Sequence, residues 1–86
     1  MIEGTTKNGF NFRIEEDIAD DWEILETIRK SNEDAAYVID VAEKVLGNEQ
    51  LEDLKEHCRE NGKVRITRMS EALAEIFDSA NTLKNS

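Results

Sequence analysis

The sequence predicts a mainly α protein: a small bundle of about four helices with a short N-terminal β-hairpin, at the margin of the α+β class. Three observations carry this prediction. An Asn-Gly pair precedes a short run of alternating apolar and polar residues, apolar residues then recur at helical spacing, and the chain contains no proline. At 86 residues it forms one domain, 1–86, with a hairpin over 5–15, a bundle over 18–83 and a frayed tail at 84–86.

The hairpin rests on Asn8-Gly9 and the segment after it. Asn-Gly is preferred in a two-residue turn, where both positions need positive φ. Phe10, Phe12 and Ile14 then alternate with polar residues, as in a strand with one buried face. Because an isolated hairpin is marginal in water, the phenylalanine face is expected to pack on the helices.

The first helix is expected over 18–30. Asp20 and Glu23 have the spacing of a capping box, in which each side chain satisfies a free backbone N–H. Arg29 and Lys30 fall at the negative end of the helix dipole. The apolar stripe expected to face the core contains Ile18, Trp22, Ile24, Leu25 and Ile28.

Glycines separate the remaining helices. Ser31 or Asn32 is expected to cap a second helix that ends at Gly47, and Asn48 to cap a third that ends at Gly62. The inner stripe of the second helix is Ala35, Val38, Ile39, Ala42, Val45 and Leu46, and that of the third is Leu51, Leu54 and Cys58. "KVRI" is expected to be an extended connector to a fourth helix, or a strand added to the hairpin. The fourth helix carries Met69, Ala72, Leu73, Ile76, Phe77, Ala80 and Leu83 on one face.

Charge and composition limit the classes of partner. The net charge is −9, which repels a phosphate backbone, so nucleic acid is not expected as a partner unless the basic stretch from Arg59 to Arg68 acts alone. No membrane span and no signal peptide are expected. The single cysteine excludes an internal disulfide and fits a reducing cytoplasm.

The acidic stretch at 13–27 invites three interpretations: a metal site, a nucleic-acid mimic, or the cap and solvated side of a helix. Its acids are Glu15, Glu16, Asp17, Asp20, Asp21, Glu23 and Glu26. Calcium loops use a glycine for their sharp turn, and this stretch has none while apolar residues interrupt it. Capping and solvation are favoured, and mimicry stays open because it requires a spatial array of acids.

No catalytic, cofactor or metal site is expected. His57 and Cys58 are adjacent, and adjacent helical residues do not face each other. Cys58 instead completes an apolar stripe, where a free cysteine behaves as a small buried hydrophobe. With one histidine in the chain, no histidine-based zinc cluster can form within it.

A partner-binding surface is the remaining hypothesis. Tyr37 and Val41 lie four residues apart, off the main stripe of the second helix, and the fourth helix is apolar along its length. The predicted surface consists of Tyr37, Val41, Ile76, Phe77 and Leu83. The competing interpretation is that the second helix is central and covered on two sides.

These segments resemble a known family. "NGFNFRIEED", "DDWEILE" and "LGNEQLEDLKEHCRENGKVRI", followed by a terminal amphipathic helix, are similar to the tail assembly chaperones of siphophages and prophages of Gram-positive bacteria. The resemblance covers about residues 5–78. None of its motifs is catalytic, and it is their order and spacing that carry the likeness.

The resemblance implies a non-enzymatic protein without cofactors. Such chaperones coat the tape measure protein, keep it soluble, recruit subunits of the major tail tube protein, and act in the host cytoplasm without entering the mature virion. They often occur in a short form and a longer frameshifted form, and this chain has the length of a short form. Self-association is left open. The alternative function is a small acidic inhibitor or DNA mimic that binds a basic nucleic-acid-binding protein.

Overall fold

The protein is mainly α with an N-terminal β-hairpin, as the sequence predicts. The computed structural model describes the backbone of residues 1–85 and the side chains of residues 1–80. Along that part of the chain the elements are β1 (Ile2–Thr5), β2 (Asn11–Ile14), the 3-10 turn η1 (Ile18–Asp20), α1 (Trp22–Glu33), α2 (Tyr37–His57), β3 (Arg59–Glu60), β4 (Lys63–Val64) and α3 (Ile66–Asn85).

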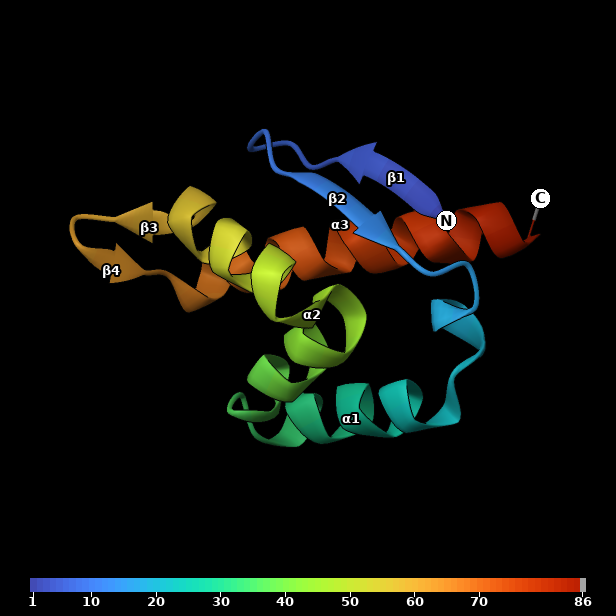
Figure 1. The fold of residues 1–86 in the computed structure, drawn as a ribbon. Helices are drawn as coiled ribbons and strands as arrows, with labels where there is room; N and C mark the ends of the chain where they lie inside the picture. Colours follow the sequence, from blue (N-terminus) through green and yellow to red (C-terminus); the bar gives the residue numbers. More distant parts are fainter. Residues whose placement is uncertain (86) are drawn as a thin grey trace.

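Helix α3 runs along the length of the molecule and organises the other elements (Figure 1). The β1–β2 hairpin contacts α3 and α2, and α1 packs on α2 at the opposite side of the molecule. The β3–β4 hairpin projects from one end (Figure 1). The resulting shape is elongated, with extents of 39 × 28 × 19 Å.

The first hairpin is longer than expected, and its turn is of another type. Ile2 pairs with Ile14, so the hairpin begins before residue 5. The Thr6 N–H donates to the Phe10 carbonyl at 2.9 Å, and the Gly9 N–H donates to the Thr6 carbonyl at 3.0 Å. These bonds enclose a three-residue loop in which only Gly9 has positive φ. The predicted two-residue turn at Asn8-Gly9 is therefore wrong.

The tight Asn-Gly turn occurs instead at the second hairpin. Asn61 and Gly62 have φ of 52° and 81°, and the flanking Glu60 and Lys63 pair with each other. This is the two-residue turn that the Asn-Gly pair favours. Gly62 therefore does not end a helix, and "KVRI" begins with a strand that pairs with β3 and not with the first hairpin.

Helix α1 starts later than predicted. Ile18 is buried in the 3-10 turn, and Asp21 after it is extended, with φ −96° and ψ 114°. The Asp21 carboxylate accepts hydrogen bonds from the N–H groups of Glu23 at 2.9 Å and Ile24 at 3.2 Å. The cap is thus Asp21 and not Asp20, because the buried turn delays the first helical residue.

The boundary between α1 and α2 also differs from the prediction. Ser31 donates its hydroxyl to the Ile28 carbonyl at 2.6 Å within α1, so neither it nor Asn32 caps the next helix. The N-cap position of α2 is Ala36, which supplies no side-chain cap, and just before the helix the Asp34 carboxylate accepts the Ala36 N–H at 3.0 Å. Glu33 is the last residue of α1 and Asp34 follows it, so neither acid lies in the first turn of α2.

Gly47 divides α2 into the two helices that the sequence predicts as the second and third. Its φ of 78° and ψ of 167° are non-helical, and an L side chain is strained there. Gln50 secures the bend: its amide donates to the carbonyls of Leu46 at 2.9 Å and Arg13 at 2.7 Å. The Arg13 N–H donates to the Gln50 Oε1 at 2.7 Å. One side chain therefore joins the bend to the outer edge of β2.

The core lies between the first hairpin, both halves of α2, and α3. Its largest fully buried side chains are Phe10, Ile14, Leu54, Cys58 and Ile76. The predicted burial of the hairpin's aromatic face and of Cys58 is confirmed. Helix α3 continues to Asn85, past the expected start of a tail at residue 84, and Ser86 lies outside the described residues.

The predicted inner stripe of α1 is wrong at two positions. Trp22 is 72% exposed and Leu25 59% exposed, whereas Ile24 and Thr27 are buried. Trp22 is the first residue of α1. A helical side chain covers the turn before its own position, and no turn of α1 precedes Trp22, because the extended Asp21 separates this residue from the 3-10 turn.

Candidate functional site

The five residues of the predicted partner surface do not form one exposed patch. Val41 is 6% exposed and Ile76 is fully buried, so both belong to the core. This corrects the predicted surface, because a buried side chain is not available to a partner. Phe77 is half-buried, and Leu83 lies outside the residues whose side chains are described.

Among the four predicted residues whose side chains are described, Tyr37 alone is exposed, at 38%. It stands at the start of α2, and the Lys30 Nζ of α1 lies 5.7 Å from its ring centroid. This cation–π contact links the two helices at the surface.

Val41 and Phe77 line a small groove between α1, α2 and α3. Its volume is about 430 Å³, and its other apolar walls come from Ile28, Ala35, Val38, Leu73 and Ala74. Two of the predicted residues therefore meet, but across a shallow hollow and not on an exposed face.

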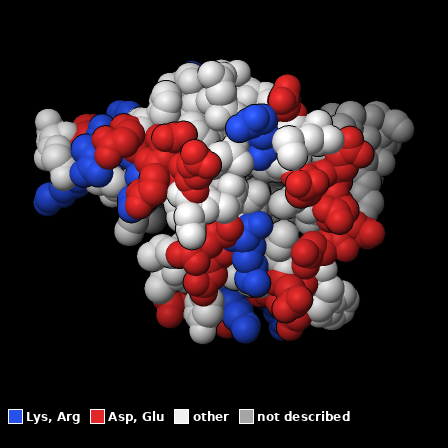
Figure 2. Space-filling view, viewed as in Figure 1, with Lys and Arg blue, Asp and Glu red and all other residues white. Residues whose placement is uncertain are grey.

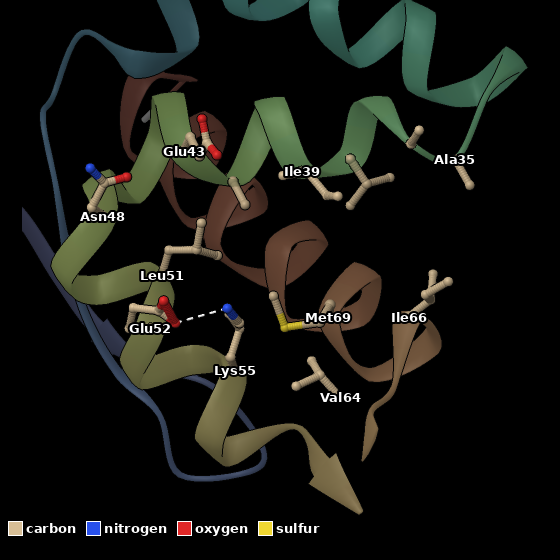
Figure 3. A pocket seen from close by; sticks show the side chains of 13 residues that line it. Ala35, Ile39, Glu43, Asn48, Leu51, Glu52, Lys55, Val64, Ile66 and Met69 are labelled. Carbon is tan, nitrogen blue, oxygen red and sulfur yellow. Dashed lines mark ion pairs between the residues drawn. The ribbon is translucent and has the colours of Figure 1, made fainter. Parts of the chain in front are cut away.

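A large groove of about 640 Å³ lies on the other side of Val38. It is lined by Ala35, Ala36, Val38, Ile39, Ala42, Glu43, Asn48, Leu51, Glu52, Lys55, Val64, Ile66 and Met69. Figure 3 shows these side chains around an open concavity between α2, β4 and the start of α3. Its volume lies within the range of ordinary ligand pockets.

The bend at Gly47 creates this groove. The first half of α2 lines one side of it, with Val38 and Ile39. The second half lines another side, where Figure 3 shows Leu51 and Lys55. A straight helix could not enclose a concavity with its two halves. The sequence locates the bend, but not the hollow inside it.

The chemistry of the large groove is mainly apolar. Val38, Leu51 and Met69 are partly buried against the core, while Ile39 and Ile66 at the rim are 60% and 67% exposed. Sequence reasoning misses both rim residues. It assigns Ile39 to the inner stripe and Ile66 to a connector, and no local signal separates a rim position from a core position.

The charged groups of the groove all come from α2. Glu52 and Lys55 form an ion pair at 2.9 Å, drawn as a dashed line in Figure 3. No ion pair joins Glu43 to a base among the side chains of residues 1–80. The groove therefore offers one uncompensated carboxylate beside an apolar floor.

The acidic stretch at 13–27 points outward. All seven acids are exposed. Figure 2 shows acidic side chains spread over this face, with Lys and Arg at the projecting hairpin and also at separate places across the middle of the face. Glu16 accepts a hydrogen bond from the N-terminal amine at 2.8 Å. This bond raises the pKa of the amine and lowers the pKa of the Glu16 carboxyl. The predicted exposure of these acids is confirmed, whereas the cap is Asp21 and not the predicted Asp20.

His57 and Cys58 do not form a reactive pair. The Cys58 thiol is fully buried, and this burial raises its pKa, which disfavours the nucleophilic thiolate. The His57 ring packs edge-on against Phe10, with centroids 5.6 Å apart. Among residues 1–80, no three His, Cys, Asp or Glu side chains gather in a way that could hold a metal ion.

Two of the basic residues in the Arg59–Arg68 stretch form ion pairs with acidic residues. Arg59 pairs with Glu56 at 3.1 Å, and Arg68 pairs with Glu60 at 2.6 Å. The Arg59 contact lowers the pKa of the Glu56 carboxyl. The charges of these two arginines are therefore compensated locally by neighbouring acids.

Comparison with protein-family models, with curated proteins and with solved structures found no match. Within the described part of the chain, no helix is both long enough and apolar enough to cross a bilayer. The large groove is therefore interpreted from its own geometry and chemistry.

Proposed function

We propose that the protein is a non-enzymatic tail assembly chaperone that binds the tape measure protein, keeps it soluble and helps to recruit tail tube subunits. The observation that carries this proposal is the large apolar groove on a molecule of net charge −9. Net charge keeps a small protein soluble, and an apolar groove receives apolar segments of a partner. The sequence resemblance supplies the identity of the partner.

The exposed rim supports binding to another protein. Ile39 and Ile66 keep most of their surface in water, on opposite sides of one hollow. Many copies bound along one long partner would gain affinity through multivalency. Modest affinity at each groove then permits release when tube subunits arrive. The chaperone acts in the host cytoplasm and is absent from the mature virion.

The test is co-expression with the tape measure protein of the same genome, followed by pull-down at low and high salt. Soluble, salt-resistant recovery of that otherwise insoluble protein supports the proposal. Ile39→Glu is expected to reduce recovery. Leu25→Glu is the matched control, because Leu25 is equally exposed on α1 and does not line the groove. An insoluble tape measure protein beside folded, excess wild-type protein refutes the proposal.

One observation favours a second candidate, an acidic inhibitor or DNA mimic. The seven acids at 13–27 are all exposed, as binding to a basic protein requires. Attraction between exposed charges is screened by salt. Recovery of a basic nucleic-acid-binding protein that is lost at high salt, and is unaffected by Ile39→Glu, identifies this function instead.

A further inference from the structure

We infer that the large groove binds an amphipathic helix of another protein, and that this helix carries lysine or arginine beside its apolar face. The inference rests on the proposed function and specifies the chemistry of its partner. It follows from three features of the groove: the type of backbone that lines it, the apolar character of its floor, and the charge of its walls.

The backbone that lines the groove favours a helical partner over an extended one. Apart from Val64 and the two residues before α2, every residue around the groove lies in α2 or α3. Away from the helix starts at Asn48 and Ile66, the backbone groups of these residues bond within the helix. An extended peptide would therefore bury its own N–H and C=O groups without partners, which is costly. A helix satisfies these groups internally, as in other complexes of a helix with a groove.

The apolar surface selects a helix with one apolar face. Partly buried Val38, Leu51 and Met69 form the floor, and exposed Ile39 and Ile66 stand at the rim. Apolar residues at i, i+3, i+4 and i+7 of the partner helix can cover this floor. Ile39 and Ile66 can then contact the two sides of that helix.

The charge of the groove walls favours a partner helix with basic residues. Helix α2 carries six acids and two bases. Within the groove, Lys55 already pairs with Glu52, whereas Glu43 has no ion-pair partner among the described side chains. A base on the partner beside its apolar face would meet the free carboxylate. An acid there would meet like charge, which is unfavourable.

The same charges argue against a second copy as the occupant. Helix α1 carries three acids and two bases, and so does α3. Each helix of the chain is therefore net negative and is repelled by the walls of α2. The fitting partner is a different, basic helix.

The test uses four labelled synthetic peptides of equal length. The first has leucine at i, i+3, i+4 and i+7 with lysine at the flanking positions, and the second has glutamate in place of each lysine. The third has two central prolines that break the helix, and the fourth is a scrambled form of the first. Binding is measured by fluorescence anisotropy with the full-length protein.

We expect the lysine peptide to bind at least about tenfold more tightly than the other three. Ile39→Glu, and independently Ile66→Glu on α3, should each weaken it about tenfold or more. Leu25→Glu should leave it unchanged. Glu43→Gln should reduce the preference for lysine over glutamate without removing binding.

Four results would overturn the inference. Two concern the peptides: equal binding of the lysine and glutamate peptides, and undiminished binding of the proline or scrambled peptide. Two concern the protein: equal effects of Leu25→Glu and the rim variants on binding, and self-association of the protein that Ile39→Glu abolishes. Circular dichroism of each variant confirms the fold, and the two rim variants lie on different helices, so misfolding of one leaves the other decisive.

The two proposals fail separately. If the peptides do not bind but the tape measure protein is still recovered in soluble form, the chaperone function stands and the helix inference is wrong. If the lysine peptide binds at the groove while the tape measure protein remains insoluble, the helix inference stands and the partner belongs to another class of protein.

Discussion

Replacing Gly47 by alanine tests whether the bend in α2 depends on this residue. With φ 78° and ψ 167°, an L residue costs about 1–3 kcal/mol. A Cβ there meets no atom within 4 Å, so no clash adds to the cost. Alanine also restricts the unfolded chain, which offsets about 0.4–1 kcal/mol. With the middle of both ranges, the net loss of unfolding free energy is about 1.3 kcal/mol, or about 5–10 °C in Tm for a domain of this size.

The assay is thermal and urea unfolding followed by circular dichroism. The matched control is D-alanine at position 47, introduced by chemical synthesis, which adds the same methyl group with opposite chirality. For a D residue this backbone conformation is unstrained, so the control should match the wild type or exceed its stability by up to about 1 kcal/mol. The difference between the two alanines isolates the backbone strain.

The reasoning is refuted if the L-alanine and D-alanine proteins melt together at the wild-type temperature. It is refuted equally if L-alanine raises both Tm and the helical signal, because α2 would then have straightened. In that case the large groove would lose one of its walls, and peptide binding should disappear.

Three further predictions concern the first cap, the edge of β2 and the buried thiol. Asp21→Ala should lower the unfolding free energy by about 1 kcal/mol. The control Asp17→Ala removes no side-chain cap bond and should change the unfolding free energy by less than about 0.5 kcal/mol. Equal effects of the two substitutions contradict the assignment of Asp21 as the cap. Gln50→Ala should lower the unfolding free energy by about 1–2 kcal/mol, because the hydrogen bonds to Arg13 are lost. It should also speed hydrogen exchange of the Arg13 amide proton. An unchanged exchange rate contradicts the link between Gln50 and β2. The raised pKa of Cys58 means that the folded state holds the thiol proton more tightly than the unfolded state. Its contribution to stability is therefore complete below the unfolded pKa of about 8.5 and is lost as pH rises beyond it. Urea midpoints should fall at high pH less steeply in Cys58→Ala than in the wild type, and identical slopes contradict the assignment.

The sequence alone determined the features that depend on local periodicity and backbone chemistry. Alternation placed Phe10, Phe12 and Ile14 on one buried face, and helical spacing placed Cys58 in the core. The glycine at 47 marked the break between two helical segments, because it tolerates positive φ. These properties arise within a few residues, so a short window of sequence contains them.

The tertiary structure decided which equivalent local signals prevailed. Asn8-Gly9 and Asn61-Gly62 carry the same turn signal, yet only the second forms the two-residue turn. At the first pair, the Thr6 hydroxyl accepts the Phe10 N–H at 3.2 Å, and the loop is one residue longer, because Thr6 and not Lys7 pairs with Phe10.

The candidate site depended on tertiary structure most of all. Val41 and Ile76, predicted at the partner surface, are core residues, while Ile39 is assigned to an inner stripe by its spacing and lies 60% exposed at the rim of the groove. Helical periodicity defines a face but not what covers it. Coverage depends on the direction that the chain takes after Gly47 and on the position of α3, and both are set by contacts between residues far apart in the sequence.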